Sequence, residues 1–272
     1  MTAQKKSSVP IAMTIAGSDS GGGAGIQADL KTFAMHCVHG TCALTCVTAQ
    51  NTQGVTRVDA LPPEAVVAQI QAVVSDIGVI ATKTGMLLNQ EIIDAVAHEV
   101  QSLGLSNLVV DPVMVSRTGA QLIDNQAVAC LRDVLIPLAT IVTPNCYEAQ
   151  ILSGLEIHTL DDMLQSAQRI HQLGAKAVLV KGGGMKGDLR GVDVWFDGEK
   201  LSTLTTSLVV TSNTHGTGCT LSSAIAANLA LGLDLKKAAQ LAKDYVTTAL
   251  KYSLDIGQGP GPVGHFFPLL LS

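Results

Sequence analysis

Two glycines and a cysteine stand directly before a helix-forming segment in the C-terminal third of the chain. The stretch Asn213–Thr220 reads Asn-Thr-His-Gly-Thr-Gly-Cys-Thr, and apolar residues recur at every fourth position across 221–229. Gly216 and Gly218 therefore belong to a turn that opens a helix, where free backbone N–H groups and the helix dipole favour an anion. Cys219 falls in the first helical turn, and the same field would lower the pKa of its thiol. Any glycine-rich helix start makes such a turn, so a purely structural role stays open.

Polar residues and glycines also gather where the predicted strands end. The apolar runs 108–110 and 178–180 are continuous, which is typical of a parallel sheet covered by helices on both faces. In such sheets, ligands bind beyond the carboxyl ends of the strands. The sequence therefore predicts a site at that edge, formed by Gly17-Ser18-Asp19, Lys83-Thr84-Gly85-Met86, Asp111-Pro112, Pro144-Asn145 and Lys181-Gly182.

The elements that must position these residues alternate between strands and helices, which predicts an α/β fold. Strands are expected at 11–16, 41–48, 55–60, 77–82, 108–111, 140–142 and 177–181, followed by an antiparallel pair at 191–196 and 202–210. Helices are expected at 24–37, 62–75, 89–102, 124–133, 146–153, 160–173, 217–231 and 235–253. No linker, repeat or low-complexity segment interrupts the pattern. We therefore expect a flexible N-terminus at residues 1–9 and a single domain over residues 10–272.

The composition limits the classes of function. The chain has 272 residues, of which 47% are hydrophobic and 14% charged, as in a compact soluble fold. Aromatic residues make up 3%, the net charge is −5, and Lys and Arg form no cluster beyond pairs, so nucleic acid is disfavoured as a partner. The six cysteines lie partly in apolar runs, as free thiols do in a reducing cytoplasm. No apolar run reaches the ~18 residues of a membrane helix, so we expect a cytoplasmic protein without a membrane partner.

Three other motifs fail in their sequence context. Gly23–Ala28 fits the dinucleotide pattern G-x-G-x-x-A, yet the stretch 30–58 contains no acidic residue that could bind the ribose. Asp19–Gly22 resembles the nucleophile segment of a trypsin-type protease, but the first histidine, His36, comes after it. The histidines and cysteines of 36–46 include no C-x-x-C pair and partly alternate along a predicted strand, which favours core packing over zinc.

Oxygen ligands suited to a phosphate-bound Mg²⁺ occur at two strand ends. Asp111 ends one strand, and Asn145 and Glu148 stand three positions apart after another. Such ligands suit Mg²⁺ that keeps several waters and is shared with substrate phosphates. Asn followed three residues later by Glu is equally the pattern of a helix capping box, so the spacing leaves both roles open. Lys181, also at a strand end, needs a buried or ligand anion to stay charged.

Two longer segments resemble the signatures of hydroxymethylpyrimidine/phosphomethylpyrimidine kinases. These segments are Ala16–Thr32 and Asn213–Thr220. Five further segments match in order: Thr48–Thr52, Lys83–Met86, Asp111–Met114, Thr143–Asn145 and Val180–Gly183. That family belongs to the ribokinase-like superfamily and serves thiamin biosynthesis, and the resemblance extends from about residue 10 to the C-terminus. It implies a three-layer α/β/α sandwich with a mostly parallel central sheet.

The resemblance also implies an activity. Family members use ATP and Mg²⁺ to phosphorylate the hydroxymethyl group of 4-amino-5-hydroxymethyl-2-methylpyrimidine, and many then phosphorylate the monophosphate to the pyrophosphate. The family is commonly dimeric, so we expect a homodimer. Phosphoryl transfer requires mainly positioning and charge stabilisation, which a helix N-terminus and Mg²⁺ supply.

Residue roles follow from the resemblance, position by position. The pyrimidine pocket would be lined by Gly17, Asp29, Thr48, Gln50, Met86 and Val113, with the Gln50 amide facing the ring nitrogen and the amino group. Mg²⁺ would be placed by Asp111, Asn145 and Glu148, and ATP would contact Asn145, Lys181 and Lys243. Gly216, Gly218 and Cys219 would form the anion hole for the transferred phosphoryl group. We hypothesise that Cys219 accepts the hydroxyl proton.

Three positions depart from the common family pattern. Thr48 stands where Val is frequent, which changes the polarity of the pocket, and Arg117 stands where Lys is frequent, which keeps the charge. Gly184 replaces a frequent His, so the details of that loop are not transferred.

Other functions fit the sequence less well. The nearest alternative is a pyridoxal/pyridoxine kinase of the same superfamily, but the context of Gln50 and Met86 favours a pyrimidine. A non-catalytic pyrimidine-binding regulator would be expected to lose Cys219 or the pair Asn145 and Glu148, and this chain keeps all three. A nicotinamide oxidoreductase is weakened by the missing ribose carboxylate.

Overall fold

The computed structural model describes residues 9–114 and 123–271. Most of the N-terminal segment expected to be flexible, residues 1–8, and Arg117 lie outside the described residues. Among the helices that are described, none combines the length and apolarity needed to cross a bilayer.

One nine-stranded sheet forms the centre of the described chain, in the order β3-β2-β1-β4-β5-β6-β7-β8-β9. The strands β2, β1, β4, β5, β6 and β7 are parallel, whereas β3, β8 and β9 extend the two edges through antiparallel pairs. This arrangement confirms the prediction of a mostly parallel sheet with an antiparallel pair near its end. The strands are β1 (Ile11–Asp19), β2 (His39–Asn51), β3 (Gly54–Ala60), β4 (Ala81–Thr84), β5 (Leu108–Val110), β6 (Ile141–Val142), β7 (Val178–Val180), β8 (Asp193–Phe196) and β9 (Leu201–Leu204).

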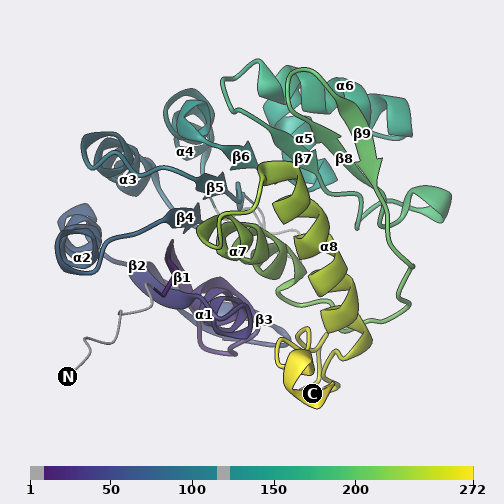
Figure 1. Cartoon of the computed structure of the whole chain (residues 1–272), viewed down its shortest axis with the longest axis horizontal. Helices are drawn as coiled ribbons and strands as arrows, with labels where there is room; N and C mark the ends of the chain where they lie inside the picture. The colour runs from purple at the N-terminus through teal and green to yellow at the C-terminus, as the bar shows by residue number, and fades with distance from the viewer. Residues whose placement is uncertain (1–8, 115–122, 272) are drawn as a thin grey trace, which may run out of the picture.

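Helices cover both faces of the sheet (Figure 1). One face carries α1 (Gly25–Met35), α7 (Thr217–Ala230) and α8 (Leu235–Lys251). The other carries α2 (Pro63–Asp76), α3 (Gln90–Ser102), α4 (Asn125–Cys130), α5 (Cys146–Ser153) and α6 (Leu160–His171). The helical layers confirm the α/β/α sandwich. Single helical turns occur at Leu131–Leu135, Ile136–Leu138, Gly187–Leu189 and Phe267–Leu270.

Two apolar cores explain why the central strands are apolar without alternation. Leu108 and Val110 belong to the core beneath α2–α6, whereas Val109 between them belongs to the core beneath α1, α7 and α8. Because successive side chains point to opposite faces of a sheet, a strand buried on both sides needs apolar residues at every position.

The structure corrects three predicted boundaries. The strand expected at 77–82 is β4 (Ala81–Thr84), because α2 continues to Asp76 and Ile77 caps it. The strand expected at 41–48 is β2 (His39–Asn51), and it ends in a tight turn in which the side chain of Asn51 accepts hydrogen bonds from the N–H groups of Gln53 and Gly54. The last strand ends at Leu204 rather than at residue 210. Beyond it the chain leaves the sheet for α8, where Thr206 and Thr247 share a hydrogen bond of 2.7 Å.

Helix α7 is the most enclosed of the described helices. Every residue from Thr220 to Ala230 is buried, because the helix packs between the sheet, α1 and α8 (Figure 1). A helix buried on all sides requires small and apolar residues all round. Its first turn, by contrast, lines a cavity at the carboxyl edge of the sheet.

Candidate active site

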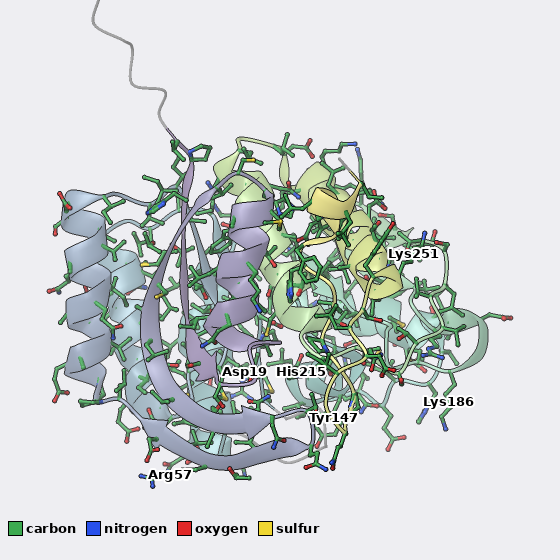
Figure 2. All side chains as sticks on the ribbon, turned by 90° about the horizontal axis from the view of Figure 1, so that it is seen from below. Asp19, Arg57, Tyr147, Lys186, His215 and Lys251 are labelled. Carbon is green, nitrogen blue, oxygen red and sulfur yellow. The ribbon has the colours of Figure 1, made fainter. Side chains whose placement is uncertain are left out.

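The carboxyl ends of the parallel strands border a cavity of about 930 Å³. The cavity lies at the edge of the sheet where the sequence predicts a site. Figure 2 shows Asp19 and His215 side by side here, and Tyr147 lines the same cavity. The predicted site residues in its lining are Gly17, Thr48, Gln50, Met86, Asp111, Val113, Asn145, Glu148, Lys181, Gly216, Gly218, Cys219 and Lys243.

Two glycine-rich loops pack against each other at the start of α7. Gly216 has a φ of 81°, and a β-carbon there would lie 1.8 Å from the carbonyl oxygen of Gly23. Both the left-handed backbone and the close approach therefore require glycine at this position. No side chain among the described residues caps the start of α7. The first turn of α7 lines the cavity, and the N–H groups of a helix start have no partner within the helix, which is the arrangement that the sequence predicts for an anion.

A lysine and an aspartate stand beside this helix start. The Nζ of Lys181 lies 3.0 Å from Oδ1 of Asp111, and Ser222 donates to Oδ2 of the same carboxylate at 3.2 Å. Although burial alone would lower it, the carboxylates of Asp111 and Glu148 raise the pKa of Lys181, so the ammonium stays charged. A β-carbon on Gly218 would lie 3.3 Å from Lys181 Nζ. The absence of a side chain at Gly218 thus keeps the helix side of the Lys181 ammonium uncrowded.

Asn145 and Glu148 form the capping box of α5. The N–H of Asn145 donates to Glu148 Oε2 at 2.8 Å, and the N–H of Glu148 donates to Asn145 Oδ1 at 3.0 Å. Burial raises the pKa of Glu148 to about 7, even though the ammonium of Lys181 opposes the shift. The structural alternative that the sequence left open is therefore present, and both side chains also line the cavity.

The carboxylates at the cavity fit a Mg²⁺ that is shared with phosphates. Across residues 9–114 and 123–271, no three His, Cys, Asp or Glu side chains gather into a site that could hold a metal by themselves. Asp111 and Glu148 supply two carboxylates close enough to influence the same lysine. Mg²⁺ typically binds through one or two carboxylates, several waters and substrate phosphates, and this donor set meets that requirement.

Asp29 lies beneath the cavity and does not line it. Its side chain is fully buried, and Oδ2 accepts hydrogen bonds from Thr14 Oγ1 at 2.6 Å and from Lys83 Nζ at 2.8 Å. Ser223 of α7 donates to the other oxygen, Oδ1. In this structure the Asp29 carboxylate is therefore engaged by three partners from three other elements and does not border the cavity, so its expected contact with the pyrimidine stays a prediction.

Lys83 is a cavity residue to which the sequence reasoning gave no role. It is fully buried, and its ammonium pairs with Asp29. A lysine directly after the predicted strand 77–82 was a usable signal, because a lysine at a strand end requires a buried or ligand anion to stay charged. The sequence did not reveal which carboxylate supplies that anion.

The pKa of the Cys219 thiol differs from the expectation. Burial raises its pKa to about 11, and the carboxylates of Asp29 and Asp111 act in the same direction. The ammonium of Lys83 and the N–H of Gly25 oppose this shift without cancelling it. The prediction of a thiol pKa lowered by the helix start is therefore wrong, because the desolvation of the thiolate outweighs the nearby positive charge.

Two of the expected ligand residues are held by neighbouring groups. Gly17 is closely packed, since a β-carbon there would lie 2.6 Å from Cys46 Sγ and 2.9 Å from Met86 Cε. Lys243 of α8 donates to the carbonyl oxygen of Gly191 and to Asp193 Oδ2, both at 2.7 Å. The structure thus brings both residues to the cavity with their positions fixed.

Asp19 and His215 form a pair that the sequence reasoning also missed. His215 Nε2 lies 2.8 Å from Asp19 Oδ2, although the residues are 196 positions apart. Asp19 was placed at the predicted edge and His215 in the glycine-rich segment, but neither residue was given a role or paired with the other. The length of chain between the two residues explains why no spacing argument could pair them.

The fold and the site together define a kinase of the ribokinase-like class. A mostly parallel α/β/α sandwich carries a glycine-rich helix start, a lysine and two carboxylates at one edge of its sheet. The chain belongs to the phosphomethylpyrimidine kinase family, whose model matches residues 19–264.

Individual relatives support this membership. A hydroxymethylpyrimidine/phosphomethylpyrimidine kinase of Synechococcus elongatus is 62% identical over 261 residues, which is 96% of this chain and 99% of the relative. The thiamine biosynthesis bifunctional protein ThiED of Geobacter sulfurreducens is 48% identical over 93% of this chain, which spans 51% of that protein. Among solved structures, an ADP complex of Bacillus subtilis pyridoxal kinase is similar with a TM-score of 0.90 and 42% identity, covering 97% of this chain and 100% of the other.

The raised pKa of Glu148 predicts a pH-dependent stability. The folded protein holds the carboxyl proton at a pKa of about 7, above the ordinary value of 4.5. Because the unfolded chain binds that proton less tightly, this group's contribution to stability falls as the pH rises from 4.5 to about 7. Glu148→Gln keeps the capping box but removes the titration. We therefore expect wild type to lose stability relative to Glu148→Gln over this pH range, in urea unfolding measured at several pH values.

A matched control is Glu64→Gln, which changes an exposed glutamate in the first turn of α2. A constant stability difference between wild type and Glu148→Gln at every pH would contradict the assignment.

Proposed function

We propose that this chain transfers the γ-phosphoryl group of ATP to 4-amino-5-hydroxymethyl-2-methylpyrimidine, and then phosphorylates the monophosphate to the pyrophosphate, in thiamin biosynthesis. The observation that carries the proposal is that the start of α7, Lys181 and Gln50 open into one cavity in a member of the phosphomethylpyrimidine kinase family. The names of the Synechococcus and Geobacter relatives support the substrate and the pathway. The ADP complex of the similar pyridoxal kinase supports the nucleotide.

The positions around the cavity suggest how the reaction is arranged. The pyrimidine would lie among Gly17, Gln50 and Met86, and the phosphates of ATP would lie between the start of α7 and Lys181. When bound by Asp111 and Glu148, Mg²⁺ would neutralise part of the phosphate charge. Backbone N–H groups that are already oriented stabilise developing negative charge without reorganisation.

The raised pKa of Cys219 changes the role we propose for it. A thiol with a pKa of about 11 is protonated at neutral pH, which disfavours it as the acceptor of the hydroxyl proton. In a loose phosphoryl-transfer transition state the nucleophile needs little help from a base. We therefore propose that the thiol positions the hydroxymethyl group, and that the proton leaves by way of a phosphoryl oxygen to solvent.

The proposal also includes the organisation of the protein. We propose one folded domain over residues 10–272, a homodimer and a cytoplasmic location, and the family model, which matches residues 19–264, supports the single domain. Lys243 and Asn145 remain our candidates for contacts to ATP, because both line the cavity and Asn145 adjoins Lys181 through a β-bridge.

A pyridoxal kinase is the second candidate. The high structural similarity to the Bacillus pyridoxal kinase favours it. Gln50 and Met86 line the cavity where the resemblance expected a pyrimidine, which keeps the pyrimidine first.

Release of ADP from Mg-ATP tests the function directly. We expect turnover with hydroxymethylpyrimidine and with its monophosphate, and little with pyridoxal. Lys181→Met is the matched control for contaminating kinases, because loss of the ammonium should lower kcat by about 100-fold or more. Faster turnover of pyridoxal would show that pyridoxal, not the pyrimidine, is the substrate. No turnover with any of the three compounds would favour a binding regulator.

The role of Cys219 predicts a flat pH profile. We expect kcat/KM for the pyrimidine to change less than about threefold between pH 7 and pH 9, and Cys219→Ser to keep activity within about tenfold, since loss of a general base typically costs 10²–10⁴-fold. A rise of about tenfold per pH unit that disappears in Cys219→Ser would make the thiolate the base after all.

A further inference from the structure

We propose that Asp19 and His215 fix the orientation of the Gln50 amide and thereby direct the hydroxymethyl group of the pyrimidine toward α7. Neither residue has a role in the reaction as described above. The inference rests on the proposed function and concerns how the same cavity recognises its substrate. Asp19 and His215 act here as positioning residues.

The carboxylate of Asp19 is held as a hydrogen-bond acceptor. Its Oδ2 accepts from the N–H groups of Gly23 at 3.0 Å and Ala24 at 2.8 Å, and its Oδ1 accepts from Gly21 N–H at 2.8 Å. Although burial opposes ionisation, the hydrogen bonds from His215 and the backbone lower the pKa of Asp19. An ionised carboxylate has no hydrogen to donate.

His215 must therefore carry a hydrogen on Nε2, which lies 2.8 Å from Asp19 Oδ2. This holds whether or not Nδ1 is also protonated. The ring packs closely over Gly23, where a β-carbon would lie 2.4 Å from its Cδ2. The backbone of His215 is fixed as well, through hydrogen bonds of 3.1 Å with Gly261 and Val263.

Two fixed groups border the amide of Gln50. Its Nε2 lies 3.5 Å from His215 Nε2, and its Oε1 lies 3.3 Å from Thr48 Oγ1. The hydrogen of His215 Nε2 points to Asp19, and the hydroxyl of Thr48 donates to the carbonyl oxygen of Ser18 at 2.7 Å. The N–H of His215 therefore faces the amide nitrogen of Gln50, so two donors meet. The hydroxyl oxygen of Thr48 faces the amide oxygen of Gln50, so two acceptors meet.

One half-turn of the amide removes both mismatches. The amide oxygen then faces the N–H of His215, whose hydrogen is bonded to Asp19, so that opposite partial charges meet, and the amide nitrogen donates to Thr48. We infer that Gln50 binds its ligand in this orientation, with its acceptor on the His215 side and its donor on the Thr48 side. The Asp19–His215 pair sets this order because His215 cannot present a free lone pair at Nε2.

This order determines which way the pyrimidine lies. In the substrate, the amino group stands between the ring nitrogen and the carbon that bears the hydroxymethyl group. Because the amide oxygen accepts from the amino group, the amino group and the hydroxymethyl group lie on the His215 side. His215 directly precedes Gly216–Cys219, so the reacting hydroxyl is directed to the helix start.

The same order selects against a reversed hydrogen-bond pattern. A 4-oxo analogue carries an acceptor in place of the amino group and a donor at the neighbouring ring nitrogen. Its oxygen would face the amide oxygen of Gln50, and its ring N–H would face the amide nitrogen. Buried polar groups that are left unpaired in this way weaken binding strongly. The pair therefore makes the cavity specific for an amino group beside a ring nitrogen.

Nitrogen-15 NMR of the histidines tests the first step without any substrate. We expect His215 to carry its hydrogen on Nε2, with His215→Gln assigning the signal among the seven histidines. A neutral His215 protonated only at Nδ1 would overturn the inference.

Calorimetric binding of the amino and 4-oxo pyrimidines tests the consequence separately from turnover. We expect wild type to favour the amino compound by about tenfold or more, and His215→Leu to lose most of that ratio. His215→Gln, whose amide can still donate to Asp19, should keep most of it. Thermal melts identify variants that fail to fold, in which case Gln50→Leu, which removes the amide itself, should likewise abolish the ratio.

Equal weakening of both compounds in His215→Leu would overturn the inference and leave His215 a structural role. If wild type binds neither pyrimidine, the proposed function and the ring orientation both fail, while the NMR measurement still decides the Asp19–His215 step.

Discussion

A buried ion pair beneath the cavity joins the four elements on which the site depends. Asp29 of α1 pairs with Lys83 of β4, and both side chains are fully shielded from solvent. Thr14 of β1 and Ser223 of α7 complete the hydrogen bonds of the carboxylate. Burying two charges is unfavourable unless the pair is well formed and further hydrogen bonds satisfy it. The interaction therefore holds only while all four elements keep their positions.

Helix α7 makes the same kind of contact twice in succession. Ser223 reaches Asp29, and Ser222 before it reaches Asp111, which in turn pairs with Lys181. Two neighbouring serines thus fix the first turns of α7 against two carboxylates from different elements. The backbone N–H groups at the helix start are oriented before any ligand arrives, which is the condition under which such groups stabilise transition-state charge.

What the sequence predicted depended on local pattern. The helices, the continuous strands and the glycine-rich start of α7 follow from spacing and turn residues, and the structure confirms them. Three features depended on contacts between distant residues. The partners of Asp29 come from three other elements, the pKa of Cys219 depends on burial, and Asp19 meets a histidine 196 positions away. The capping box at Asn145 was predictable only in part, because its local pattern fits both a helix cap and a ligand site.

The central claim is that a phosphoryl group lies between the start of α7 and Lys181. Gly218→Ala tests it most directly, because a β-carbon there would lie 3.3 Å from Lys181 Nζ and 3.8 Å from Asp111 Oδ2. Alanine favours a helix over glycine by about 1 kcal/mol, so the free energy of unfolding should stay the same or rise. Our account predicts that kcat falls by about 100-fold or more while the melting temperature is retained. Unchanged kcat in a folded Gly218→Ala variant would contradict it.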